Sequence, residues 1–380
     1  MRRVMLTATG VVTAFGAGEQ PLWQGLLAGR TCVGPTPDFM GGRVSVARVP
    51  DEALAGLHGD RSFRMLQQAA QQVQRCAAYR RVEGHRLGVC VGTTQGPIET
   101  WIRHQQRLAA DGAHRPPLPG LYAPAHQLAE LLGARGPLAC PSMACASGTA
   151  AIGLAMDWLR EGRCDAVVAG GVDALSELVH TGFQRLRALD PALPRPFDAR
   201  RAGLALGEGA GLVLLEADVD DGIQLAGRGL SADANHLTGP DPTGFGVVRA
   251  IRDALADAQR GEAEVDFVNA HGTATVFNDL MESRALLQIF GEPRAWSVPV
   301  NSIKGAIGHT MGAAGAVEAV LCSLVLREQV VPPTVGLEQQ DPEIPLDVVQ
   351  SRPRAGSFRT VVSTSSGFGG VNAALVFTAI

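Results

Sequence analysis

Short apolar runs rich in β-forming residues alternate along this chain with longer segments rich in Ala and Leu. The short runs predict strands and the longer segments predict helices. Strands are expected at residues 86–92, 166–172, 212–216, 265–270 and 361–364, and helices at residues 62–80, 147–162, 246–259 and 312–327. Strands that alternate with helices in this way indicate an α/β layered fold.

Two stretches of the chain look like copies of one unit. One begins at Ala144 (ACASGTAAIGLAMDWLREGRCDAVVAGG) and the other at Gly308 (GHTMGAAGAVEAVLCSLVLREQVVPPT). Each contains a small-residue turn, an Ala-rich helix of roughly four turns, a charged break and an apolar run. We therefore expect two halves of similar topology, residues 1–220 and 221–380, with the seam near residues 217–225, where 217–222 is acidic and turn-like.

The composition excludes several classes of protein. A chain of 380 residues with 46% hydrophobic and 18% charged residues is long enough for two domains and too apolar for disorder. Its net charge of −4 gives no general argument for binding nucleic acid or a membrane surface. No uncharged apolar run reaches the roughly 18 residues that a membrane span needs. Seven cysteines without CxxC pairs argue against a disulfide scaffold or a zinc site, and they favour a reducing cytoplasm.

The opening residues, MRRVMLTATGVV, place two arginines before an apolar stretch, as a signal peptide does. Thr7 and Gly10 interrupt that stretch, so it predicts the first strand instead. Residues 35–57 and 109–123 are rich in Pro and Gly, and they predict loops or caps over the core.

A cysteine at the start of a small-residue helix is the first candidate for chemistry. Cys145 lies in the segment MACASG, where small neighbours leave room for a bound group. Partial positive charge and free N–H groups at a helix N-terminus favour a thiolate and can lower its pKa. The alternative is a buried, inert thiol. We assign that role to the other six cysteines, including Cys164 before a strand and Cys322 within a helix.

Two histidines also occupy turns where ligand sites form. His271, in NAHGTAT, ends an apolar strand and is followed by Asp279 and Glu282. A histidine at that place is as consistent with the core as with function. In NSIKGAIGH, Lys304 and His309 lie on a Gly-rich turn before a helix. The alternative interpretation of the lysine is a solvated side chain.

A fourth segment, SGFGGVN, lies near the C-terminus. Gly369 and Gly370 permit positive φ and close approach of the backbone to another group. Phe368 between the glycines is either a gate or a core anchor.

Together and in this order, these segments resemble the β-ketoacyl–acyl-carrier-protein synthases, the elongating ketosynthases of fatty acid and polyketide assembly. The resemblance spans nearly the whole chain. Its motifs are VMLTATGVVTAFG, ACASG, RPFDARRAGLALGEGAGLVLLE, NAHGTAT, NSIKGAIGHTMGAAGAVE and GFGGVN. Initiating ketosynthases carry Asn where this chain has His309, thiolases use a second cysteine as base, and chain-length-factor partners lack the active cysteine. Ala274 and Ile303 depart from the Ser and Thr that are frequent in the family.

The resemblance implies a thiolase-like fold of five layers, α-β-α-β-α, built from two similar halves. It also implies a decarboxylative Claisen condensation between an acyl group on Cys145 and a malonyl-carrier protein, giving a 3-oxoacyl thioester. The backbone N–H groups of Cys145 and Phe368 would form the oxyanion hole. His271 and His309 would polarise the malonyl thioester carbonyl.

The resemblance gives further residues supporting roles. Lys304 and Glu318 would hold the tautomers of the histidines, and Asp279 would belong to the same network. Thr273 and Thr275 would hydrogen-bond the phosphopantetheine arm. Phe368 would move to separate the two half-reactions, next to Gly369 and Gly370, which we also assign to substrate binding.

No cofactor or metal is expected, because the phosphopantetheine belongs to the substrate's acyl carrier protein. A homodimer whose interface borders the acyl tunnel is implied, and a heterodimer with a ketosynthase-like partner is the alternative assembly. An acidic carrier predicts a basic patch at the tunnel mouth. Its candidate members are Arg61, Arg64, Arg200 and Arg201.

Two rival functions remain: a non-catalytic partner that sets chain length, and a thiolase that acts on coenzyme A thioesters. Retention of Cys145, His271, Lys304 and His309 argues against the partner, and a histidine in place of the second cysteine argues against the thiolase. Residues 179–196 and 109–123 are expected to shape the pocket, but they do not specify an acyl chain length or a pathway.

Overall fold

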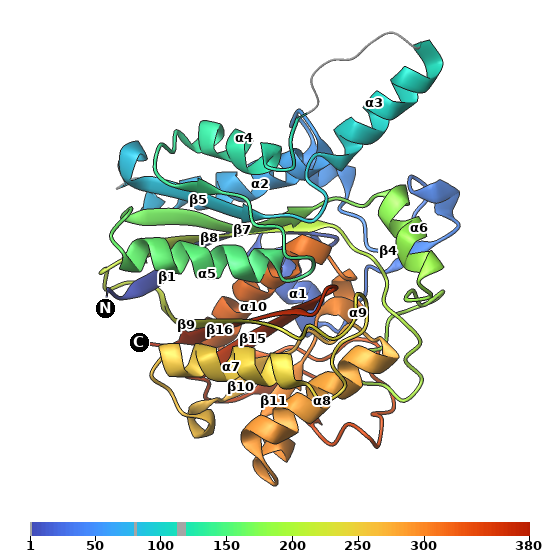
Figure 1. Cartoon of the computed structure of the whole chain (residues 1–380), viewed down its shortest axis with the longest axis vertical. Coiled ribbons are helices and arrows are strands. Elements are labelled where there is room, and N and C mark those ends of the chain that lie inside the picture. Colours follow the sequence, from blue (N-terminus) through green and yellow to red (C-terminus); the bar gives the residue numbers. More distant parts are fainter. Residues whose placement is uncertain (1, 80–81, 112–118) are drawn as a thin grey trace.

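Five layers stack in the order α-β-α-β-α in the computed structural model, which describes residues 2–79, 82–111 and 119–380 (Figure 1). The middle layer holds α5 (Ser147–Arg160) and α10 (Ala314–Glu328), which contact each other. The outer helices are α2 (Arg61–Arg75) and α4 (Ala123–Leu132) on one side and α7 (Phe245–Asp257) and α8 (Val276–Phe290) on the other. The expected thiolase-like layering is confirmed.

The two sheets share one pattern of strand directions. In each, three neighbouring strands are antiparallel and the next two continue parallel. The first sheet runs β1 (Val4–Thr13), β8 (Gly209–Ala217), β7 (Ala166–Asp173), β5 (Leu87–Gly92), β6 (Leu138–Ala139). The second runs β9 (Ile223–Ala232), β16 (Val371–Thr378), β15 (Thr360–Gly367), β10 (Phe267–Asn269), β11 (Pro299–Asn301), β13 (Asp347–Val348).

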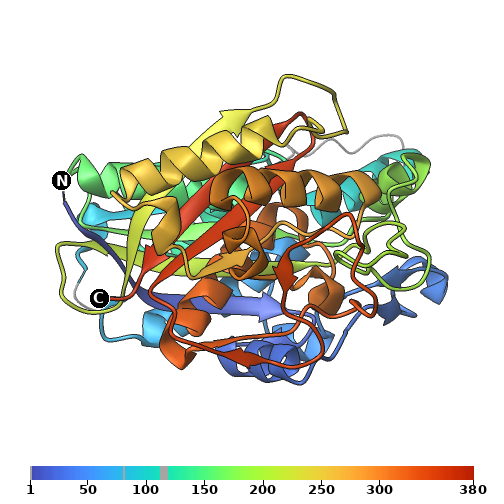
Figure 2. The same ribbon diagram turned by 90° about the horizontal axis from the view of Figure 1, so that it is seen from below.

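The two sheets join where β1 and β9 pair over two residue pairs. In the view of Figure 2, α7 (yellow) lies across the strands β15 and β16 (red) of the second sheet. The remaining described elements are shorter or peripheral. They are β2 (Gly16–Ala17), α1 (Glu19–Leu27), β3 (Gly34–Pro35), β4 (Ser45–Val46), α3 (Ile98–Asp111), α6 (Glu177–Arg185), α9 (Lys304–Ile307), β12 (Val330–Val331) and β14 (Arg354–Ala355).

Small side chains explain why two helices fit between the sheets. Every residue of α10 from Ala314 to Leu326 is buried. A Cβ atom added to Gly148 of α5 would lie 2.8 Å from the carbonyl oxygen of Gly312 and 3.0 Å from the nitrogen of Ala316. Only glycine permits this approach, and it sets the start of α5 directly against the start of α10.

The predicted elements are found with shifted ends. The predicted helix 62–80 ends as α2 at Arg75, because Cys76 has an extended backbone, and Arg80 lies outside the described residues. Residues 35–57 contain only short strands and 3₁₀ turns. Of residues 109–123, the first three continue α3 and Ala123 begins α4, while 112–118 lie outside the described residues.

The second repeat unit differs from the first in one respect. The apolar run after α10 forms β12, which pairs with β14 in a separate two-stranded sheet outside both of the sheets described above. β15, further along the chain, occupies the position that β7 has in the first half. In the part of the chain that the structure describes, no helix is long and apolar enough to cross a membrane.

We predict that Gly148→Ala lowers the free energy of unfolding by about 1–3 kcal/mol, because a methyl group here overlaps the backbone of the neighbouring segment. Gly182→Ala is the matched control, since an added Cβ in α6 meets nothing within 4 Å. It should stabilise the protein by roughly 0.5–1 kcal/mol. Urea denaturation measures both. Equal effects of the two substitutions would contradict the close-packing account.

Candidate active site

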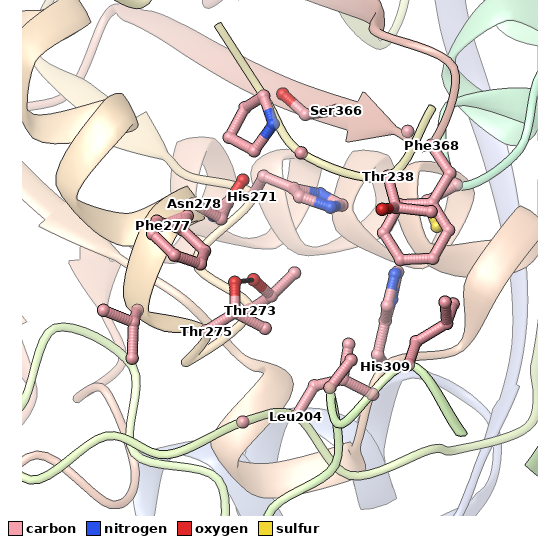
Figure 3. A pocket seen from close by; sticks show the side chains of 18 of the residues that line it. Leu204, Thr238, His271, Thr273, Thr275, Phe277, Asn278, His309, Ser366 and Phe368 are labelled. Carbon is pink, nitrogen blue, oxygen red and sulfur yellow. Dashed lines mark hydrogen bonds between the residues drawn. The ribbon is translucent and has the colours of Figure 1, made fainter. Parts of the chain in front are cut away.

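A cavity of about 330 Å³ gathers the predicted residues from four distant parts of the chain. Cys145, His271, His309 and Phe368 all line it. Figure 3 shows the two imidazoles directed into the same space, with Thr273 and Thr275 below His271. Other lining side chains include Phe183, Arg187, Asp233, His236, Thr238, Phe277, Asn278 and Ser366.

Cys145 lies in a tight turn two residues before α5. Ala144 has a positive φ of 48°, which is uncommon for a residue with a side chain. The Ser147 hydroxyl secures the turn by accepting from the Met143 N–H at 2.8 Å and donating to the Ala144 carbonyl at 2.6 Å. The turn leaves Cys145 only 8% exposed, at the wall of the cavity.

The electrostatic surroundings of Cys145 differ from the sequence prediction. Burial raises the pKa of its thiol to about 12, although the Lys304 ammonium lowers it, and the Asp173 carboxylate raises it further. The predicted lowering of the pKa by a helix N-terminus is therefore wrong, because desolvation of the anion outweighs it. A thiol that is protonated at neutral pH needs a base to accept its proton when it attacks.

The two histidines form a perpendicular pair. Their ring centroids are 5.2 Å apart, with an interplanar angle of 84°. Burial, followed by the positive charge of Lys304, lowers the pKa of each imidazole well below its usual value. Both rings are therefore neutral at pH 7, and each can accept a proton or donate one hydrogen bond.

Lys304 and Glu318 form a buried ion pair whose lysine acts electrostatically on both rings. Lys304 Nζ donates to Glu318 Oε1 at 2.5 Å, and both side chains are almost fully buried. The sequence predicts that this pair holds the histidine tautomers. Among the described residues, however, Nδ1 of His271 and Nδ1 of His309 have no hydrogen-bond partner. The pair therefore acts on the rings through its charge, and it does not hold either Nδ1 by a hydrogen bond.

Asp279 supports the turn before α8. Its carboxylate accepts from the backbone N–H of Phe197 at 2.8 Å and of Ala274 at 3.2 Å. Burial raises the pKa of Asp279 to about 7, and the neighbouring Glu282 carboxylate also raises it.

Glu282 is the positioning residue to which the sequence assigned no role. Its carboxylate accepts from the backbone N–H of His271 at 2.7 Å and of Gly272 at 2.6 Å. The Thr364 hydroxyl donates to the same side chain from β15. Glu282 lies three residues after Asp279, on one helix face. In the sequence, two acidic residues three positions apart follow a His-Gly pair, and this pattern could have identified Glu282.

The glycine-rich turn after β15 is tied to a second loop. Gly369 N–H donates to the Leu237 carbonyl at 2.8 Å, and Asp233 N–H donates to the Gly370 carbonyl at 2.7 Å. Phe368 stacks on Phe183, with ring centroids 5.4 Å apart. The predicted segment 179–196 therefore does contribute to the pocket wall, whereas the sequence did not single out the 233–240 loop.

The hydroxyl groups of Thr273 and Thr275 lie 2.9 Å apart on the cavity wall. Both can still reorient toward a bound amide, since a hydroxyl both donates and accepts. Within the described residues, no three His, Cys, Asp or Glu side chains are grouped as metal ligands.

The predicted basic patch is wrong for two of its four arginines. Arg61 is buried and binds both carboxylate oxygens of Glu208. Arg201 is buried as well, in an ion pair with a neighbouring loop. Arg64 and Arg200 are more accessible, but each faces a carboxylate. The two buried arginines pair with carboxylates of this chain. The sequence alone does not show which arginines are buried and which lie on the surface.

A five-layered fold with a thiol and two neutral imidazoles in one cavity defines a condensing enzyme of the thiolase fold. Residues 1–220 match the family model for the N-terminal domain of beta-ketoacyl synthase, and residues 223–338 match the model for its C-terminal domain. The chain belongs to the beta-ketoacyl synthase family, whose members are condensing enzymes of the acyltransferase type.

Known relatives align over almost the entire chain. Nodulation protein E of Rhizobium meliloti (strain 1021) is 35% identical, over 99% of each chain. 3-Oxoacyl-acyl-carrier-protein synthase 2 of Synechocystis is also 35% identical, over 99% of this chain and 98% of the relative. A solved type II polyketide acyl-carrier protein in complex with its ketosynthase bound to the hexaketide gives a TM-score of 0.90 at 28% identity, over 100% of both chains. The ishigamide ketosynthase/chain length factor gives 0.89 at 31% identity, over 100% of this chain and 99% of that one.

We predict that Glu282→Gln slows malonyl decarboxylation about tenfold or more, while acylation of Cys145 is retained. The amide has one acceptor oxygen in place of two, so a buried N–H beside His271 loses its partner at a cost of about 1–3 kcal/mol. Carbon dioxide release and acyl-enzyme mass measure the two steps separately. Glu216→Gln, at another buried glutamate outside the cavity, should change neither. Equal loss of both steps in Glu282→Gln would contradict a positioning role.

The pH dependence of decarboxylation tests the neutral imidazoles. Because the pKa of each ring lies well below 6.5, protonation should switch the reaction off only at a pH below 6.5. The decarboxylation rate is measured as a function of pH for the unsubstituted protein and for Asp279→Asn. The variant is included because the pKa of Asp279 is raised to about 7, so this carboxyl group could produce a rate change of its own. A loss of rate centred at or above pH 6.5 that persists in Asp279→Asn would contradict neutral histidines.

Proposed function

We propose that this chain catalyses the decarboxylative Claisen condensation of an acyl group on Cys145 with a malonyl-acyl carrier protein. The product would be a 3-oxoacyl-acyl carrier protein of fatty acid or polyketide/polyene biosynthesis. The observation that carries the proposal is the convergence of Cys145, His271 and His309 on one cavity. The reaction needs a nucleophile for acyl transfer and hydrogen-bond donors for an enolate.

In the first step, Cys145 Sγ attacks the thioester carbonyl of an acyl-carrier protein. A neutral imidazole takes the thiol proton and returns it to the departing pantetheine sulfur, so the C–S bond to the carrier breaks as the bond to Cys145 forms. The backbone N–H groups of Cys145 and Phe368 would stabilise the oxyanion. The raised pKa of the thiol makes the base necessary at this step.

In the second step, a malonyl thioester occupies the same cavity. Its C–C bond to the carboxylate breaks, CO₂ leaves, and the electron pair remains as an enolate. Among the described residues, no hydrogen bond at Nδ1 fixes either tautomer, so each neutral ring can carry its proton on Nε2 at this step. His271 and His309 would then donate from Nε2 to the enolate oxygen. The enolate carbon attacks the acyl carbonyl, the C–S bond to Cys145 breaks, and the Cys145 thiolate takes a proton from water.

The substrate and its partner proteins follow from this reaction. The acyl and malonyl groups would arrive on the phosphopantetheine arm of an acyl carrier protein, and Thr273 and Thr275 would hold the arm. A solved neighbour contains such a carrier bound to its ketosynthase, and others contain a chain length factor. We propose a homodimer, or a heterodimer with a ketosynthase-like partner. A thiol and two imidazoles on the wall of one cavity favour a catalytic chain over a non-catalytic partner.

Substitutions at the cavity test the proposal. Cys145→Ala should abolish acyl-enzyme formation in intact mass measurements, because Cys145 is the only cysteine among the described residues that line the cavity. Cys145→Gln should still release CO₂ from malonyl-carrier protein.

His309→Ala should be acylated but release at least about a hundredfold less CO₂. Undiminished acylation of Cys145→Ala, or normal CO₂ release by His309→Ala, would contradict the assigned roles.

A further inference from the structure

A buried carboxylate at the end of β7 contacts the turn that follows His309. Asp173 is the last residue of β7, and its side chain is fully buried. Its Oδ2 accepts from the backbone N–H of Gly312 at 2.7 Å. Gly312 lies three residues after His309, in the 3₁₀ turn Met311–Ala313 that leads into α10. A side chain from the first half of the chain therefore holds a turn that belongs to the second half.

The same carboxylate is fixed to the loop that follows β5. The Thr93 hydroxyl donates to Oδ1 at 2.7 Å, and the Gln95 N–H donates to it at 3.1 Å. Thr94 donates to the carboxylate from both its N–H and its hydroxyl. Burial raises the pKa of Asp173, and the hydrogen bonds lower it. Backbone N–H groups can only donate, and each carboxylate oxygen accepts from at least one of them, which favours the ionised form.

Other contacts from the first half hold His309 as well. Its backbone N–H donates to the Ala205 carbonyl at 2.7 Å, and its carbonyl accepts from the Gly207 N–H at 2.9 Å. Two residues further on, Met311 Sδ accepts from the Gln95 side-chain amide at 3.3 Å. The first half therefore contacts the segment both at His309 and in the turn that follows it.

The two imidazoles are thus positioned by different halves of the molecule. The His271 N–H donates to Glu282 at 2.7 Å and to Thr364 at 3.2 Å, and both of these residues belong to the second half. His309 is attached to the first half, which also carries Cys145. The placement of His309 relative to the sulfur therefore depends on contacts such as that of Asp173.

Glycines leave little free space around the Asp173–Gly312 contact. A Cβ atom on Gly312 would lie 2.7 Å from Asp173 Oδ2 and 3.0 Å from the nitrogen of Thr94. A Cβ atom on Gly171 of β7 would overlap the carbonyl oxygen of Gly312. The Gly312 peptide is therefore confined on both sides, and a change at the carboxylate should displace the turn.

We propose that Asp173 is a positioning residue for decarboxylation, which holds the turn after His309 and thereby places that imidazole beside Cys145. The inference rests on the proposed function, in which His309 donates to the enolate oxygen. A small displacement of a catalytic group lowers the rate of the step that it serves. Acylation of Cys145 does not require His309 in the proposed mechanism, so it should tolerate the displacement.

Asp173→Asn tests the inference on the full chain. The amide has one acceptor oxygen in place of two, and its own N–H groups face donors, so the contact with Gly312 is weakened or lost. The probes are hexanoyl- and malonyl-loaded acyl carrier protein of fatty acid synthesis. CO₂ release should fall about tenfold or more, while acylation, followed by intact mass, should stay within about threefold of the unsubstituted rate.

Asp60→Asn is the matched control. Asp60 is also a buried aspartate, and it accepts from the N–H and the hydroxyl of Ser62 and of Thr100. It does not line the cavity. Both variants should have lower thermal midpoints than the unsubstituted protein, but only Asp173→Asn should change the ratio of CO₂ release to acylation. An equal ratio in the two variants would overturn the inference.

Gly312→Ala separates position from charge, and it replaces Asp173→Asn if that variant does not fold. Its methyl group displaces the carboxylate but leaves the charge in place. The Asp173 charge raises the pKa of Cys145, so its removal should increase thiolate and speed alkylation of Cys145 by iodoacetamide at pH 8. We expect faster alkylation in Asp173→Asn only, and slower CO₂ release in both variants. Slower CO₂ release in Asp173→Asn alone would assign the effect to charge and overturn the positioning role.

The unsubstituted protein distinguishes failure of this inference from failure of the proposed function. If it is acylated and releases CO₂, and the ratio of the two rates is unchanged in Asp173→Asn and Gly312→Ala, the role of Asp173 alone is overturned. If the unsubstituted protein is not acylated and releases no CO₂ from the malonyl-loaded carrier, the proposed function is overturned and this inference with it.

Discussion

Two helices that begin with small side chains, α5 and α10, pack against each other between the sheets, and the geometry of the site depends on that contact. The turn before α5 holds Cys145, α10 holds Glu318, and the residues leading into α10 include His309 and Lys304. Gly148 lets the two helix starts approach to backbone contact. Because the starts meet, groups more than a hundred residues apart in the chain surround one cavity. A bulkier middle layer would separate the thiol from the imidazoles.

Burial then sets the protonation states of the site. Desolvation disfavours charge, so the pKa of the Cys145 thiol is raised and the pKa values of both imidazoles are lowered. Lys304, paired with Glu318, keeps a positive charge in the same region and stabilises the neutral rings further. The site is therefore built from neutral groups that exchange protons and donate hydrogen bonds where negative charge develops in the reaction. Asp279 and Glu282 act on the backbone of the histidine turn and do not line the cavity.

The layered fold and the positions of Cys145, His271 and His309 could be predicted from sequence, because each lies in a short motif whose local turn determines where it points. The long-range contacts could not. The sequence around Arg61 and Arg201 does not distinguish them from surface arginines. Only the fold shows that both are buried and that each pairs with a carboxylate. The pKa of Cys145 was predicted in the wrong direction, because helix position is visible in the sequence and desolvation is not. The role of Glu282 and the contribution of the 233–240 loop follow from contacts with His271 and with the turn that contains Phe368, which only the fold shows.

The central claim is that one sulfur and two imidazoles act on a single thioester carbonyl. A crystal structure of the protein after alkylation by a chloroacetamide analogue of pantetheine tests it most directly, because the amide carbonyl stands where the thioester carbonyl would lie. The account predicts a covalent bond to Cys145 Sγ and a carbonyl oxygen within about 3 Å of Nε2 of both His271 and His309. An adduct on another cysteine, or a carbonyl directed away from both rings, would contradict it.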